Sequence, residues 1–209
     1  MSFKKSVLLH DKSVIVFISY MDKPIFIIFA GLIGTGKSTL ANLLSKKLNI
    51  PVISSDIIRK KLAGISITEH KYEEFEKGIY SRKFTDKTYT EIFKKAKEFL
   101  IKGSSVIIDA SFQRRTDRNL VLNMADELGI KVFVVETLCK DEEIKKRLNT
   151  RINDKKQASD GRWEIYSIQK EAFEAIDEIK EDFHIIIDTT KVIEVCIKKV
   201  LEKLQVKYD

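Results

Sequence analysis

Short apolar runs alternate with amphipathic segments along most of this chain. The runs predict strands at 25–30, 51–54, 105–109, 131–137 and 184–188. The first run, Ile25-Phe26-Ile27-Ile28-Phe29-Ala30, has no polar position, which is typical of a strand covered on both faces. Between the runs, apolar residues recur at helical spacing. This alternation predicts an α/β fold in which helices cover both faces of a parallel sheet.

Three of the intervening segments carry a clear helical stripe. The stripes consist of Tyr89, Ile92, Phe93, Ala96, Phe99 and Leu100, then Leu120, Val121, Met124, Ala125 and Leu128, and finally Ile193, Cys196, Ile197, Val200, Leu201 and Leu204. Gly103 and Gly129 follow the first two stripes and predict helix ends there. The last stripe makes Cys196 a packing residue of the core.

A phosphate-binding loop is predicted between the first strand and a helix in which Leu40, Leu43, Leu44 and Leu48 recur at helical spacing. Residues 31–38 read Gly-Leu-Ile-Gly-Thr-Gly-Lys-Ser and fit Gly-x4-Gly-Lys-Ser/Thr without deviation. In such a loop the backbone N–H groups surround phosphate oxygens, Lys37 reaches the terminal phosphates, and the Ser38 hydroxyl helps to hold Mg²⁺. We therefore predict a nucleotide-binding segment made of Gly31, Leu32, Ile33, Gly34, Thr35, Gly36, Lys37, Ser38 and Thr39.

Ligands of open parallel sheets bind beyond the carboxyl ends of the strands, so the residues after each strand matter most. Asp56 and Arg59 follow the second strand. They are either a helix start with a local ion pair or a catalytic pair, in which Asp56 accepts the proton of an acceptor hydroxyl and Arg59 holds the acceptor. Beside a phosphate loop we favour the catalytic interpretation. Asp109 ends the third run and is predicted to serve hydrated Mg²⁺ together with Ser38.

Two arginines follow the fourth strand at a spacing of four, Arg147 and Arg151. Two like charges at this spacing oppose an isolated helix by roughly 0.2–0.5 kcal/mol, whereas an anion between them reverses the sign. Paired arginines on a closing lid suit the charge of a transferred phosphoryl group. The alternative is a solvated basic face that packs through Ile144, Leu148 and Ile152. The polar segment 153–161 is the predicted tip of the lid.

Two further polar segments remain open to two interpretations each. Residues 112–118 are either acceptor-binding groups or an ordinary loop and helix start. Residues 188–191 either flank an adenine or cap the last helix, and we favour the cap. The segment 64–88, rich in polar and aromatic residues, is the part of the chain that we expect to shape an acceptor pocket.

Composition limits the expected partners and location of the protein, but it does not identify a substrate. The formal charge of +7 favours polyanionic partners, but its basic clusters are short and scattered. Two distant cysteines, Cys139 and Cys196, form no disulfide framework, so a cytoplasmic location is expected. The three histidines show no ligand spacing, so we expect no zinc. No segment reaches the length of a membrane span. We expect a monomer or a homodimer.

The chain is predicted to hold a single domain over 24–209, with a lid at about 147–162. Residues 1–23 are an extension or contribute an extra strand at 14–18. Alternatively, Met21 is the natural start, because residues 21–24 lead directly into the first core strand.

The order of Gly31–Ser38, Ser55-Asp56-x-x-Arg59, the strand ending at Asp109 and Arg147-x3-Arg151 resembles the P-loop kinases grouped as predicted ATP-binding kinases. The same order occurs in the kinase domain of polynucleotide 5′-hydroxyl kinases and, more distantly, in zeta toxins and gluconate kinases. The resemblance covers residues 25 to about 190. It implies a three-layer P-loop NTPase sandwich with strand order 2-3-1-4-5, and ATP and Mg²⁺ as cofactors.

The same resemblance implies that Lys37 and Ser38 hold ATP and Mg²⁺, that Asp56 is the general base, and that Arg147 and Arg151 are lid arginines. By the same resemblance, Arg59 would bind the acceptor and Asp109 would serve the metal. The first hypothesis is an ATP-dependent phosphotransferase acting on a hydroxyl of a small molecule. The second is a 5′-hydroxyl kinase of RNA or DNA, which we rank lower because such kinases usually carry a phosphatase or ligase domain. The third is an ATP-dependent switch without an acceptor, in which Asp56 would have no role.

Overall fold

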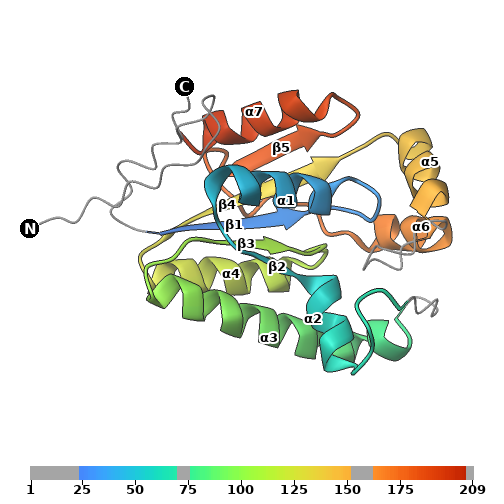
Figure 1. The fold of residues 1–209 in the computed structure, drawn as a ribbon, viewed down its shortest axis with the longest axis horizontal. Coiled ribbons are helices and arrows are strands. Elements are labelled where there is room, and N and C mark those ends of the chain that lie inside the picture. The colour runs from blue at the N-terminus through green and yellow to red at the C-terminus, as the bar shows by residue number, and fades with distance from the viewer. Residues whose placement is uncertain (1–23, 70–75, 152–161, 206–209) are drawn as a thin grey trace, which may run out of the picture.

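A computed structural model describes residues 24–69, 76–151 and 162–205. Its sheet has five parallel strands in the order β2-β3-β1-β4-β5 (Figure 1). The strands are β1 (Ile25–Ala30), β2 (Val52–Ser54), β3 (Val106–Asp109), β4 (Lys131–Leu138) and β5 (His184–Asp188). The predicted α/β class, strand positions and strand order are therefore confirmed, with boundaries that differ by one residue at most.

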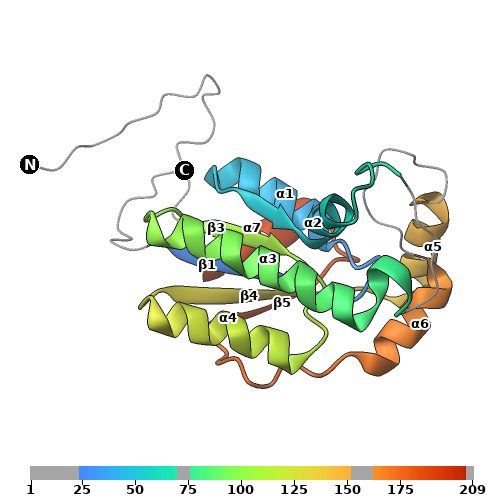
Figure 2. The ribbon, with the colours of Figure 1, turned by 90° about the horizontal axis from the view of Figure 1, so that it is seen from below.

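Helices cover both faces of the sheet, as Figures 1 and 2 show. They are α1 (Lys37–Leu48), α2 (Ser55–Leu62), the 3-10 helix η1 (Gly78–Tyr80), α3 (Arg82–Ile101), α4 (Arg115–Glu127), α5 (Asp141–Arg151), α6 (Trp163–Ala172) and α7 (Ile193–Lys203). Helices α3 and α4 lie on one face, and α1 and α7 lie on the other. Helices α5 and α6 lie beyond the carboxyl ends of the strands (Figure 1).

The central strand β1 is buried on both faces because its side chains alternate between two cores. Phe26, Ile28 and Ala30 pack with α3 and α4, whereas the other three residues pack with α1 and α7. This explains why the run carries no polar position. The helical stripes are confirmed except at their edges, where Phe99 and Leu120 are exposed.

Several predictions fall outside the described residues. They include the extra strand at 14–18, the alternative start at Met21 and the lid tip at 153–161. Helix α6 was not predicted from the sequence. Within the described part of the chain, no helix combines the length and apolar character that crossing a membrane requires.

Candidate functional site

The predicted phosphate loop joins β1 to α1 at the carboxyl edge of the sheet (Figure 1). Its three glycines have positive φ angles: +130° at Gly31, +79° at Gly34 and +89° at Gly36. At Gly31 a Cβ atom would lie 2.6 Å from the carbonyl oxygen of Thr137 on β4. A side chain at this position would collide with backbone, so the first glycine is required both by conformation and by space.

The loop is held by bonds to one of its own carbonyl groups. The carbonyl oxygen of Leu32 accepts hydrogen bonds from Lys37 Nζ at 2.7 Å and from Thr35 Oγ1 at 2.7 Å. Lys37 therefore folds back over the loop. The first bond into α1 runs from the Leu40 N–H to the Gly36 carbonyl, so the amides of the turn before Leu40 lie at the open end of the helix. Such an end favours phosphate.

Two threonines hold this loop in place: Thr137, which was not singled out from the sequence, and Thr189, which lies in the segment 188–191. The Thr137 hydroxyl lies 2.7 Å from the Thr35 hydroxyl and donates to the Ala30 carbonyl. The Thr189 hydroxyl donates to the Thr35 carbonyl at 2.7 Å. Both threonines are buried and lie at or just after the ends of neighbouring strands. Their position at strand ends is a sequence signal for this edge of the sheet, but it does not identify their hydrogen-bond partners.

The predicted cap of the last helix is wrong. Helix α7 starts after Val192, and no side chain caps its first turn. Instead, Asp188 accepts hydrogen bonds from the Thr190 amide and hydroxyl, which closes a short turn before the helix begins. Residues 188–191 therefore form a tight loop whose Thr189 faces the phosphate loop.

Helix α5 packs directly onto the phosphate loop. A Cβ atom at Gly34 would lie 2.8 Å from Ile144 Cγ2, and Leu148 lies nearby. Arg147, on the same helix, donates to the Thr189 carbonyl at 2.7 Å and to its hydroxyl at 3.1 Å. A Cβ atom at Gly36 would lie 3.5 Å from Arg147 Nη1. The structure thus brings Arg147 beside the loop, as a lid arginine requires.

Arg151 is the last residue of α5, and its side chain is not part of the description. Ile152 and the predicted lid tip lie outside the described residues. The role of Arg151 therefore stays a prediction.

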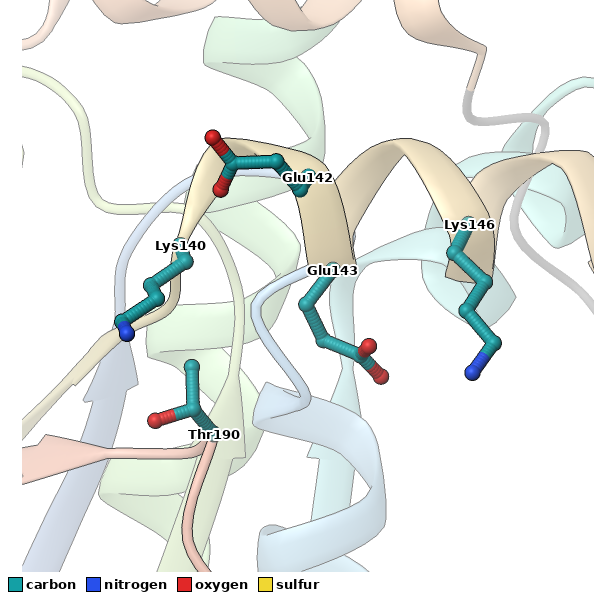
Figure 3. A pocket seen from close by; sticks show the side chains of 5 residues that line it. All are labelled: Lys140, Glu142, Glu143, Lys146 and Thr190. Atoms are coloured by element: carbon teal, nitrogen blue, oxygen red, sulfur yellow. The ribbon is translucent and has the colours of Figure 1, made fainter.

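An open hollow of about 360 Å³ lies between α5 and the loop after β5 (Figure 3). It is lined by Lys140, Glu142, Glu143, Lys146 and Thr190. The hollow adjoins Arg147, which bonds to both Glu143 and Thr189. The hollow therefore lies close to the phosphate loop, and Thr190 is the residue of the segment 188–191 that lines it.

Two predicted carboxylates follow the neighbouring strands. Asp109 ends β3, is 6% exposed, and pairs in register with Phe29 of β1 and Ser54 of β2. Just after it, the Ser111 carbonyl accepts a hydrogen bond from the Gly31 amide at 3.1 Å. Asp56 lies half-buried in the first turn of α2, directly after β2. Both carboxylates therefore come from strands on the same side of the phosphate loop.

Arg59 lies deeper than the acceptor-binding interpretation supposed. It is 7% exposed, and its Nη1 donates to the Ile79 carbonyl at 2.6 Å and to the Thr85 hydroxyl at 3.1 Å. Its guanidinium carbon lies 5.0 Å from the centre of the Tyr80 ring. Its Nε is buried without a hydrogen-bond partner. Arg59 therefore joins α2 to η1 and α3, inside the segment expected to shape the acceptor pocket.

The charged residues of 112–118 form a structural cluster. Arg118 is fully buried, donates to the Phe112 and Ala175 carbonyls, and pairs with Glu178. Arg114 pairs with Asp117 at 2.9 Å. Burial raises the pKa of the Asp117 carboxyl, although Arg114 opposes this shift. These contacts support the interpretation of this segment as a loop and helix start.

The loop after β3 also contains a residue in a strained conformation. Phe112 is fully buried with φ of +46°, and its amide donates to the Tyr89 hydroxyl at 3.0 Å. Burial raises the pKa of Tyr89 to about 12. Residues other than glycine adopt a positive φ rarely, and such residues persist where their surroundings hold them. Tyr89 therefore fixes the loop whose Ser111 carbonyl bonds to Gly31.

Among the described residues, no group of three or more His, Cys, Asp or Glu side chains is arranged to hold a metal ion. Mg²⁺ bound with a nucleotide needs only one or two protein oxygens, because phosphates and water supply the other ligands. The Ser38 hydroxyl at the start of α1 and the Asp109 carboxylate at the end of β3 carry oxygen atoms of the kind that Mg²⁺ prefers. The donor set therefore fits a magnesium nucleotide.

Comparisons with known proteins agree with this geometry. A shikimate kinase from Rhodopirellula baltica is 32% identical over 101 residues, which cover 48% of this chain and 50% of the relative. Proteins of Mycobacterium tuberculosis and Mycobacterium bovis are 35% identical over 79 residues, which cover 38% of this chain. The chain thus spans 50% of the length of that shikimate kinase and 16% of the mycobacterial proteins.

Solved structures of kinases share the fold. The APS kinase of Mycobacterium tuberculosis, solved with AMPPNP and APS, superimposes with a TM-score of 0.63 at 18% identity and covers 88% of this chain and 98% of its own. A gluconokinase from Sinorhizobium meliloti superimposes with a TM-score of 0.60 at 18% identity and covers 87% and 92%. Residues 26–176, well over half of the sequence, match the family described as an AAA domain, and the chain belongs to that family.

Proposed function

We propose that this protein transfers the γ-phosphoryl group of ATP to a hydroxyl of a small molecule. The observation that carries the proposal is the position of α5, which packs on Gly34 and holds Arg147 beside Gly36. A nucleotide-binding switch needs the loop alone, whereas phosphoryl transfer also needs positive charge where the γ-phosphoryl group moves. Arg147 supplies such a charge at the edge of the loop.

In the proposed mechanism the donor is held by the phosphate loop and the start of α1. Lys37 neutralises the terminal phosphates, and Ser38 and Asp109 would hold the Mg²⁺, which offsets phosphate charge when bound. Arg147 and Arg151 stabilise the charge that spreads over the equatorial oxygens. The hollow beside Thr190 takes the adenine.

Asp56 is the proposed general base. Its place in the first turn of α2 puts a half-buried carboxylate after the strand that neighbours β3. It accepts the proton of the acceptor hydroxyl as the new oxygen–phosphorus bond forms. Arg59 orients the acceptor, either directly through the buried Nε or by holding the Ile79 segment in place.

The acceptor is proposed to be small because shikimate kinase, gluconokinase and APS kinase are among the similar proteins. The net charge of +7 and the Ser-Asp-x-x-Arg pattern favour a second candidate, the 5′-hydroxyl of RNA or DNA. The two candidates differ only in the acceptor, so one assay separates them.

The test is a transfer assay with γ-labelled ATP, in which hydroxy acids, sugars, nucleosides and 5′-hydroxyl oligonucleotides are offered side by side. We expect one small molecule to be labelled, and the variant Asp56→Asn to lower this rate by about 10²–10⁴-fold while ATP still binds. Asp126→Asn, an exposed carboxylate late in α4, is the control and should leave the rate unchanged. Labelling of the oligonucleotide alone would replace the first candidate by the second. ATP binding with no labelled product would favour the third hypothesis, an ATP-dependent switch without an acceptor.

A further inference from the structure

The apex of the phosphate loop is tied to a helix far along the sequence. The Ile33 amide donates a hydrogen bond to the Gln169 side-chain oxygen at 2.7 Å. Gln169 lies half-buried on α6, which follows the lid segment in the chain. This hydrogen bond joins the phosphate loop to a helix that follows the predicted lid in the sequence, and the Gly-x4-Gly-Lys-Ser/Thr motif does not predict it.

The Ile33 amide and the Leu32 carbonyl belong to the same peptide group. That group is planar, so its N–H and C=O point in opposite directions and cannot turn independently. On one side, Gln169 accepts from the N–H; on the other, the carbonyl accepts from Lys37 Nζ and from Thr35. The bond to Gln169 therefore sets the direction of the carbonyl that holds the Lys37 ammonium group.

Helix α6 is itself fixed relative to the rest of the site. Tyr166 packs in a cluster with Ile144 and Leu148 of α5, and Leu32 and Ile33 of the loop pack against the same cluster. The Tyr166 hydroxyl donates to Asp141 at the start of α5. Gln169 therefore lies on a helix that packs against α5, the helix that carries Arg147.

We propose that Gln169 is a positioning residue of the phosphate loop: it orients the peptide group between Leu32 and Ile33 and so places Lys37 for the terminal phosphates of a bound nucleotide. The proposal deepens the proposed function and rests on it only in requiring that the loop binds a nucleoside triphosphate. It gives α6 a direct role in shaping the loop.

The test compares Gln169→Met, which keeps the length of the side chain but removes the acceptor, with Glu171→Met, a matched change at an exposed position of the same helix. Calorimetric titration with Mg²⁺ and AMP-PNP should show about 3–10-fold weaker binding for Gln169→Met, the loss expected for one neutral hydrogen bond. Glu171→Met should stay within about twofold of the wild type. Equal affinity of Gln169→Met and the wild type would overturn the proposal.

Two further readouts separate positioning from a general loss of structure. Trp163, the only tryptophan, stacks on Tyr166 with ring centres 5.0 Å apart, so its emission reports the packing of α6. We expect unchanged emission in Gln169→Met together with weaker AMP-PNP binding; a changed emission would assign the effect to displaced packing and contradict the proposal. Gln169→Glu keeps an acceptor and should keep the Ile33 amide protected from hydrogen exchange, whereas Gln169→Met should expose it.

If Gln169→Met does not fold, exchange in the wild type still decides. The Ile33 amide must be protected without nucleotide, and exchange as fast as that of an exposed amide would overturn the proposal. The proposed function fails separately: AMP-PNP binding without transfer to any offered acceptor would remove the phosphotransferase and leave the role of Gln169 intact.

Discussion

The two sides of the site are built in different ways. On the donor side, the phosphate loop, α5 and the loop after β5 approach so closely that glycines and threonine hydroxyls make the contacts. On the proposed acceptor side, α2 is joined to the following segment by two long buried cations, Arg59 and Lys60. Arg59 reaches the Ile79 carbonyl, and Lys60 reaches the Ile67 and Glu69 carbonyls.

This difference indicates which side of the site tolerates substitutions. Close contacts leave almost no freedom, because an added Cβ atom would meet the Thr137 carbonyl oxygen at Gly31 and the Ile144 side chain at Gly34. A long cation that holds backbone carbonyls can hold segments of different sequence, because carbonyls are common to all residues. The donor side therefore suits one ligand of fixed shape, and the proposed acceptor side suits a pocket whose sequence can vary.

The largest expected effect tests the close contacts directly. Gly31→Ala forces an alanine to φ of +130° with its Cβ 2.6 Å from a backbone oxygen, so we expect a loss of about 3–5 kcal/mol in the free energy of unfolding, measured by urea denaturation. Gly64→Ala, after α2, is the matched control. It has φ of +69° with nothing within 4 Å of the added atom, so the loss should be about 1–2 kcal/mol. Equal losses would show that the donor side is no tighter than the acceptor side.

The second prediction concerns two arginines with opposite roles. Arg147→Met should lower the rate of phosphoryl transfer by about 10²-fold, because a positive charge at the edge of the loop is lost, and should change stability little. Arg59→Met should cost about 1–3 kcal/mol of stability, because the Ile79 carbonyl and the Thr85 hydroxyl, both in half-buried residues, lose the donor that the buried Arg59 supplies.

Steady-state kinetics of both variants measure the rate of phosphoryl transfer, and urea denaturation measures the free energy of unfolding. The side chain of Arg147 is 27% exposed, whereas Arg59 is buried, so solvent can replace the first more easily than the second. A large stability loss in Arg147→Met with an unchanged rate would show that the contact with Thr189 is only structural.

Most of the fold was predictable from the sequence, because burial on both faces requires unbroken apolar runs. The phosphate loop was predictable for a related reason: its glycines and Lys37 act through local backbone geometry. Arg147 was found beside the loop as expected, since a helix after β4 must start at the carboxyl edge of the sheet.

The hydrogen bonds that hold the phosphate loop in place were not predictable from the sequence. Thr137, Thr189 and Gln169 contact residues more than 100 positions away, and such pairs depend on register and helix placement that no local pattern encodes. Arginines show the same limit. Arg118 and Arg147 both lie in polar sequence, yet the first is fully buried against Glu178 and the second lies beside the phosphate loop.

The smallest expected effect compares two tyrosine hydroxyls, one on each side of the site. Tyr89→Phe leaves the buried Phe112 amide without its acceptor and should cost about 1–3 kcal/mol in the free energy of unfolding. Tyr166→Phe, on α6, removes a bond to the half-exposed Asp141, where water can take its place, so the cost should be about 0.5–1 kcal/mol.

Urea denaturation of the two variants gives the comparison, and the hydrogen exchange of the Phe112 amide locates it. Because Phe112 holds φ of +46° only while its surroundings keep it there, Tyr89→Phe should also speed exchange at this amide. A larger loss in Tyr166→Phe than in Tyr89→Phe would reverse the argument. It would show that the contact between α5 and α6 contributes more to stability than the buried bond that fixes the loop after β3.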